Sequence, residues 1–238
     1  MNATVAGITW RAMVGRRRAL LLFALPAVLL LLAVALRLTG VADVESARVV
    51  LGAFALGTLV PLLGLIIGTG VIGPEIDDGS IVYLLSKPVS RFAIVITKLV
   101  VAVGCVAVFA VLPTLLAAVV MASGDDGLAA GYGAAALVGG AVYCSVFLMI
   151  GVLSRHAVVI GLLYALVWET LIGGYVPGAR TLSIQQWAVS VASATADEGA
   201  ISADVGLGVA VTMLVVVAVA ATGYAGWRLR SLALTGED

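Results

Sequence analysis

The stretch ALLLFALPAVLLLLAVALRL, residues 19–38, decides the fold. A transmembrane helix needs about 20 apolar residues, because it rises ~1.5 Å per residue through a hydrocarbon core of ~30 Å. This stretch has that length and carries one charge, Arg37. It follows a basic triplet at residues 16–18, so it also has the basic front and apolar run of a secretory signal peptide. We interpret it as a retained first transmembrane helix, because the run is long enough to span.

The rest of the chain has the same character. Its residues are 63% hydrophobic and 11% charged, whereas a soluble domain is roughly half apolar and a quarter charged. A water-soluble fold could not bury this much apolar surface, and continuous rather than alternating runs favour helices over barrel strands. We therefore predict an all-α, polytopic membrane protein with one domain over residues 1–238. Its six predicted spans are residues 19–38, 49–73, 92–122, 128–153, 158–175 and 205–227.

The basic residues predict the orientation, because cytoplasmic loops of membrane proteins carry the excess of lysine and arginine. With the N-terminus inside, ten basic residues fall on the cytoplasmic side. Only Arg37, Arg48 and Arg180 fall outside. We therefore expect a multi-pass protein of the cytoplasmic membrane with both termini in the cytoplasm. In this topology residues 74–91 form an inner loop and residues 176–204 an outer loop.

The sequence lacks the motifs of nucleotide-binding, nucleic-acid-binding and metal-binding proteins. It has no Gly-Lys dipeptide, so a phosphate loop of the GxxxxGK[ST] type is excluded. Its formal net charge is zero, and no basic patch suggests nucleic acid. His156 has no ligand-type neighbours at metal spacing, and Cys105 and Cys144 lie in apolar runs as small hydrophobes do. We predict no catalytic residue, no metal site and no cofactor bound by this chain.

Gly64 and Gly68 form a small-xxx-small pair in the second predicted span. Such pairs let two helices approach closely in lipid. We interpret the pair as packing within one chain, and a seam between two chains is the alternative.

The inner loop has the sequence EIDDGSIVYLLSKPVSR, residues 75–91. Asp78 or Ser80 can cap a short helix by accepting bonds from its first N–H groups. Pro88 ends that helix, because the residue before a proline avoids the α region. Three apolar residues share one face at i, i+3 and i+4: Ile81, Leu84 and Leu85. The loop therefore predicts a short amphipathic helix just outside the membrane.

Such a helix could lie on the bilayer surface or against another protein. Glu75, Asp77 and Asp78 precede it, and acidic side chains gain nothing from anionic headgroups. A protein partner is therefore better supported than lipid alone.

The stretch from residue 66 to 98 resembles the membrane subunits of type-2 ABC transporters, which are six-helix permeases of the exporter type. It is similar to the subfamily of the nitrous-oxide reductase maturation permease. Eight residues fit the family pattern: Glu75, Gly79, Leu84, Leu85, Ser86, Pro88, Arg91 and Lys98.

The resemblance implies that the inner loop is a coupling helix, which seats in a groove of a separate ATP-binding subunit. That partner would bind ATP and Mg and hydrolyse the ATP, and a second permease copy would complete a complex of two permeases and two ATPases. The ATPase-coupling residues would be Glu75, Asp77, Asp78, Gly79, Ser80, Ile81, Leu84, Leu85, Pro88 and Arg91.

A second informative stretch is YALVWETLIGGYVPGARTLSIQQW, residues 164–187. An acid within a span is costly and is a functional candidate by default. Glu169 lies ~18 Å along the fifth predicted span, at ~1.5 Å per residue. It is either a polar group on the transport path or gate, or a structural acid bonded to a neighbouring helix or to loop N–H groups. The stretch also resembles the family, in which the loop after the fifth helix forms short outer elements that close the pathway.

These observations predict the permease subunit of an ATP-binding cassette exporter, moving a hydrophobic or amphipathic substrate. One alternative is a sensor or scaffold subunit of a non-transporting ABC complex. Another is an ATP-independent channel or secondary transporter, but such proteins usually carry several intramembrane charges. In this chain Glu169 is the only acid deep in a predicted span.

Overall fold

The computed structural model describes residues 7, 16–73, 91–122, 127–172, 178 and 180–234. Every regular element within these ranges is helical, which confirms the predicted all-α fold. The α-helices are α2 (Arg16–Leu38), α3 (Val44–Val49), α4 (Val60–Gly70), α7 (Arg91–Val106), α8 (Leu112–Met121), α9 (Leu128–Leu153), α10 (Ala157–Leu163), α12 (Ile184–Thr195) and α13 (Leu207–Leu234). The remaining helices are the π-helical segments η1 (Val50–Leu59), η2 (Ala107–Val111) and η3 (Tyr164–Ile172) and the 3-10 turn η4 (Arg180–Leu182).

Consecutive elements join into long rods: α3, η1 and α4 form one, and α7, η2 and α8 form another. Within the described ranges, five helices are long and apolar enough to cross a membrane. They are Leu20–Leu38, Val44–Gly70, Phe92–Met121, Leu128–Leu153 and Leu207–Arg230.

The fifth predicted span, residues 158–175, corresponds to α10 and η3. This apolar segment is shorter than the other five, and residues 173–177 lie outside the described part of the chain. The count of six spans therefore stays a prediction.

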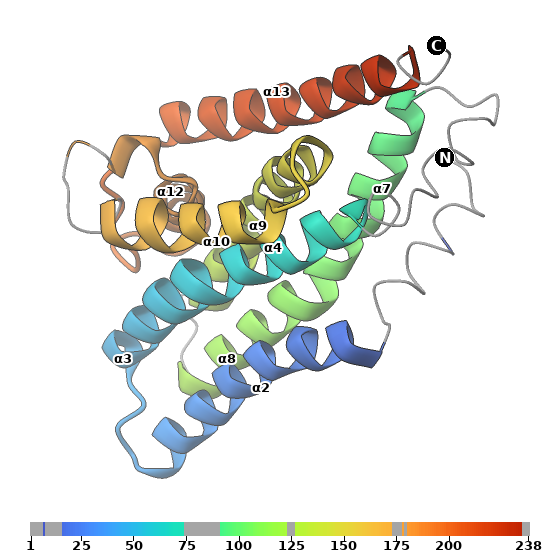
Figure 1. Ribbon diagram of the computed structural model, residues 1–238. Helices are drawn as coiled ribbons and strands as arrows, with labels where there is room; N and C mark the ends of the chain where they lie inside the picture. Colours follow the sequence, from blue (N-terminus) through green and yellow to red (C-terminus); the bar gives the residue numbers. More distant parts are fainter. Residues whose placement is uncertain are drawn as a thin grey trace.

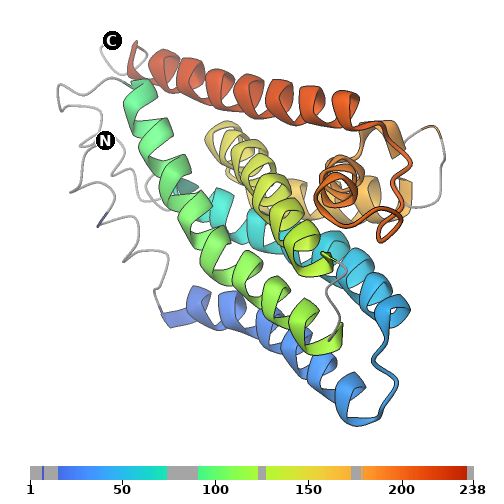
Figure 2. The same cartoon turned by 180° about the vertical axis from the view of Figure 1, so that it is seen from behind.

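The rods form one bundle with two distinct ends (Figure 1). The start of α2, the end of α4, the start of α7 and the end of α13 lie on the same side of the bundle, on the right in Figure 1 and on the left in Figure 2. We call this the loop end, because α4 and α7 flank residues 74–90, and the opposite end the far end. Our topology places the loop end in the cytoplasm, and that orientation stays a prediction.

Helix α9 is the centre of the bundle. Of its apolar window 61% is buried, against 22% for the first span and 17% for the last. A Cβ atom at Gly64 would lie 2.7 Å from the Tyr143 Cβ, and one at Gly68 would lie 2.8 Å from the Phe147 Cβ. Real Cβ atoms do not approach so closely, so both glycines let α4 contact α9 within one chain. The intramolecular interpretation of the glycine pair agrees with this packing.

The outer loop of our topology contains a packed helix, α12. A Cβ at Gly139 of α9 would lie 3.0 Å from the Ala188 Cβ, and one at Gly131 would lie 2.8 Å from the Ala192 carbonyl oxygen. Helix α12 therefore lies along the far-end half of α9, with Trp187 and Ala188 buried. The chain re-enters the bundle after η3 instead of passing over its surface.

Candidate functional site

The predicted coupling residues Glu75, Asp77, Asp78, Gly79, Ser80, Ile81, Leu84, Leu85 and Pro88 lie outside the described residues. Arg91 is the first residue of α7, and its side chain also lies outside them. The helices on either side of the loop are described, however: α4 ends at Gly70 and α7 begins at Arg91. These two helix ends form the base of the loop.

A buried lysine joins these two flanking helices. Lys98 lies two turns into α7 and is 0% exposed. Its Nζ donates a hydrogen bond to the carbonyl oxygen of Val71, the residue that caps the C-terminus of α4. The end of α4 is thus connected by a side chain to the start of α7.

This connection has a clear electrostatic cause. The last carbonyl groups of a helix have no intrahelical partner, and the helix dipole makes them the negative end. A lysine near that end is stabilised by both effects. Burying an ammonium group without such partners would cost several kcal/mol, on the order of the desolvation of one ion. Lys98 therefore holds the base of the loop in one arrangement.

The second candidate residue, Glu169, is 0% exposed in η3. Its Oε1 accepts hydrogen bonds from the Tyr164 hydroxyl at 2.9 Å and the Ile184 backbone N–H at 3.1 Å. Its Oε2 accepts from the Ser183 hydroxyl at 2.5 Å and the Gln185 backbone N–H at 3.3 Å. Four donors therefore surround one buried carboxylate, and three of them come from the start of α12.

These bonds complete the N-terminus of α12. Ser183 is the N-cap, and its hydroxyl oxygen accepts from the Gln186 N–H at 3.3 Å while its hydroxyl donates to Glu169. The Ile184 and Gln185 N–H groups bond to Glu169, so the first N–H groups of α12 all have acceptors. A carboxylate is also favoured at the positive end of the helix dipole. Glu169 thus fixes where the re-entrant helix begins.

Two tryptophans hold the turn before α12. The Trp168 Nε1–H donates to the Leu182 carbonyl at 3.3 Å, and the Trp187 Nε1–H donates to the Thr181 carbonyl at 2.8 Å. The two indoles come from η3 and α12, and both donate to carbonyl groups of η4. The Tyr164 ring also packs edge-on against Phe147 of α9, with centroids 6.1 Å apart. The turn, the carboxylate and the central helix are therefore one packed unit.

The structure shows which groups Glu169 contacts, and its role in transport stays a prediction. Its contacts are those of an acid bonded to loop backbone N–H groups, which is one of our two interpretations. The sequence analysis did not identify Tyr164, Ser183 or the backbone N–H groups of Ile184 and Gln185 as partners of Glu169. The Ser-x-x-Gln spacing of Ser183 and Gln186 was a weak capping signal, but nothing in the sequence joined it to an acid fourteen positions earlier.

A comparison with family models matched residues 3–186, which is most of the chain, to the ABC-2 family transporter protein model. The chain belongs to the ABC-2 transporter family. It is accordingly a membrane permease component of an ABC transporter, and it works with an ATP-binding cassette partner. The comparison with curated proteins found no match. The family match ends near the start of α12, so it covers both the 74–91 loop and Glu169.

Proposed function

We propose that this ABC-2 permease is an exporter subunit that pairs with a second copy of itself, each copy receiving one ATPase subunit. The ATPase would seat on the loop at residues 75–91, with Leu84 and Leu85 as the apolar contact and the acids Glu75, Asp77 and Asp78 beside it. The substrate would be hydrophobic or amphipathic. Membership of the family supports a permease subunit with an ATPase partner. The contacts of Lys98 and of Glu169 support the roles that we propose for the two ends of the bundle.

The observation that carries the proposal is the bond from Lys98 to the end of α4. A force applied to the loop must reach two helices to tilt the bundle as a rigid body. Because Lys98 joins α4 to α7 in the buried interior, a push on the loop would move both rods together.

Glu169 would act at the far end of the same helix bundle. The resemblance implies that the loop after the fifth helix closes the pathway, and α12, whose start is bonded to the Glu169 carboxylate, lies in that loop. We therefore propose Glu169 as a positioning residue of the gate. The acid would hold α12 against α9 while the substrate path opens and closes.

The test uses the purified permease–ATPase complex in nanodiscs, with spin labels on Asp197→Cys in both copies. Asp197 is exposed beyond α12, and Cys105 and Cys144 are buried, so labelling is selective. We expect a label-to-label distance that changes between nucleotide-free and ATP-bound states. Leu84→Asp should abolish the change while assembly persists. Tyr83→Asp, on the opposite side of the predicted coupling helix, is the matched control and should behave like wild type.

If the ATP-dependent distance change persists in Leu84→Asp, the loop at residues 75–91 does not transmit the motion of the ATPase to the permease. Absence of any distance between two labels in the wild-type complex would refute the paired permeases. A wild-type complex that hydrolyses ATP without any change at Asp197 would favour the sensor or scaffold alternative.

A further inference from the structure

A cavity of about 510 Å³ opens at the far end of the bundle, away from the loop, and Glu169 is not among the residues that line it. Such a volume suits a small ligand or a lipid headgroup. Four segments line it: the start of the α3–η1 rod, Tyr132 of α9, the half-buried side of α12, and the turn at residues 199–202. Its polar side chains are Glu45, Arg48, Tyr132, Gln185, Gln186 and Ser202.

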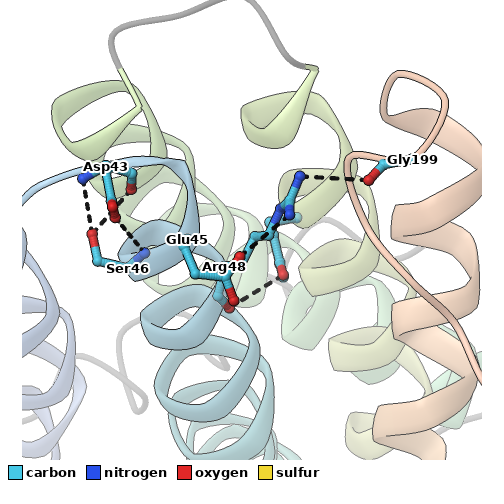
Figure 3. Close-up of polar contacts among 6 residues, drawn as sticks. Asp43, Glu45, Ser46, Arg48 and Gly199 are labelled. Atoms are coloured by element: carbon cyan, nitrogen blue, oxygen red, sulfur yellow. Dashed lines mark hydrogen bonds and ion pairs between the residues drawn. The ribbon is translucent and has the colours of Figure 1, made fainter.

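Arg48 lines this cavity, and Figure 3 shows its contacts with Glu45 and Gly199. Its Nη1 contacts Glu45 Oε2 at 3.3 Å, and its Nη2 donates to the Gly199 carbonyl at 3.5 Å. Both distances are at the long end for hydrogen bonds to a guanidinium. The Arg48 Nε atom is buried and has no acceptor within the described part of the chain. The side chain as a whole is 34% exposed, and a guanidinium carries five N–H donors, so its Nη groups can bind a further acceptor from the cavity.

The surroundings of Arg48 hold it ready for such an acceptor. The Tyr132 hydroxyl of α9 donates to the Arg48 carbonyl at 3.3 Å, and the Gln185 amide donates to the Gly52 carbonyl at 3.2 Å. These bonds fix the backbone that carries Arg48 against α9 and α12. The side-chain amide of Gln186 and the hydroxyl of Ser202 line the same space and can supply further neutral donors.

Glu45 is the acid that competes for Arg48. Its side chain is 73% exposed, and it pairs with Arg48 at i,i+3 on a helix surface. Such pairs contribute little, because both groups remain hydrated. An oxyanion that offers two oxygens to the planar guanidinium would displace Glu45, since bidentate pairs are stronger than single solvated contacts.

We propose that this cavity binds a ligand with an oxyanion, a phosphate or carboxylate, seated on Arg48. Val49, Ala53 and Val189 line the remainder of the cavity and would contact the apolar part of the ligand. The oxyanion comes either from a lipid headgroup at the membrane face or from a soluble molecule. The site needs neither the ATPase partner nor the loop, so it stands or falls independently of the proposed function.

The experiment follows thermal unfolding of the full chain in a neutral maltoside detergent by tryptophan emission. The chain is titrated with inorganic phosphate or with dihexanoyl phosphatidic acid, at constant ionic strength in chloride. We expect a saturable rise in Tm for wild type. Arg48→Met should raise the half-saturating concentration at least about tenfold, because a charge-assisted hydrogen bond is lost. Glu45→Gln should lower it, because the competing carboxylate is gone.

Arg37→Met is the matched control, since Arg37 ends α2 and does not line the cavity. Saturation by the lipid alone identifies a headgroup, and equal saturation by phosphate identifies a soluble oxyanion; both support the site. No saturable shift with either probe overturns the proposal. So does a titration that is the same in Arg48→Met as in wild type. The opposite signs expected for Arg48→Met and Glu45→Gln keep the test valid if one variant folds poorly.

Discussion

Replacing Glu169 by glutamine keeps the shape of the side chain and changes only its hydrogen bonding. Each carboxylate oxygen accepts from one hydroxyl and one backbone N–H. In Glu169→Gln one of the two oxygens becomes an NH₂ group, which donates only. The hydroxyls of Tyr164 and Ser183 can rotate to accept from it, but a backbone N–H cannot. Either amide orientation therefore leaves the Ile184 or the Gln185 N–H facing another donor.

The magnitude follows from that count. A buried donor left without an acceptor costs about 1–3 kcal/mol. Loss of the negative charge at the positive end of α12 adds to this cost. Because about 1.4 kcal/mol corresponds to a factor of ten, local opening of the first turn of α12 should become roughly 5–150 times more frequent.

Hydrogen–deuterium exchange in nanodiscs measures this opening directly. Peptides covering residues 183–188 should exchange faster in Glu169→Gln by that factor, while peptides from the loop-end half of α9 keep their rate. Glu45→Gln is the control, because Glu45 is an exposed acid outside this cap. If the first-turn amides of α12 exchange at the wild-type rate in Glu169→Gln, the carboxylate does not cap α12 in the membrane.

Three further predictions follow from the structure. Lys98→Met should speed exchange of the last turn of α4 roughly tenfold, because a charged hydrogen bond to its end is lost, whereas unchanged exchange would contradict the connection. Gly68→Val should destabilise the chain by about 1–3 kcal/mol in thermal unfolding, since its side chain would overlap a backbone carbonyl of α9. The control is Gly104→Val, where a Cβ would meet nothing within 4 Å, and an equal loss there would refute the packing argument. The Ser46 backbone N–H lowers the pKa of Asp43 below its ordinary 3.8, so the cap of α3 is stabilising above that pH and is lost as the pH falls through the lower folded value. The Tm difference between wild type and Asp43→Ala should therefore be constant at neutral pH and shrink as the pH falls from 3.8 through the lower folded pKa, and a difference that does not change over this range would exclude the carboxylate charge as its source.

Most of the fold could be predicted from the sequence, because a helix that crosses lipid needs a long apolar run. Each such run can be recognised within a single segment of the sequence. The predicted fourth span, residues 128–153, has the bounds of α9. The rod that runs from α3 to α4 began five residues earlier than the predicted second span, since the capping box of Asp43 and Ser46 starts a helix among polar residues. A hydropathy argument gives no weight to such a cap.

The candidate site was predicted less completely. Glu169 was identified because an acid in an apolar run is conspicuous. Lys98 was noted as a basic residue near the inner end of the third span and as part of the family resemblance, but its bond to Val71 spans 27 positions of sequence. The Arg48 cavity was not predicted at all, because its walls come from segments near residues 48, 132, 186 and 200. Each wall residue taken alone is an ordinary polar group near a helix end.

The sequence by itself determined that the chain forms long apolar helices suited to a bilayer, and it identified Glu169 as an unusual acid within one of them. Those properties depend on composition and spacing within single segments. Tertiary structure alone decided that α12 re-enters the bundle, that Glu169 caps it, and that Lys98 joins α4 to α7. The reason is that a buried charge is stabilised by whichever donors or acceptors packing brings to it, and distant segments supply those groups.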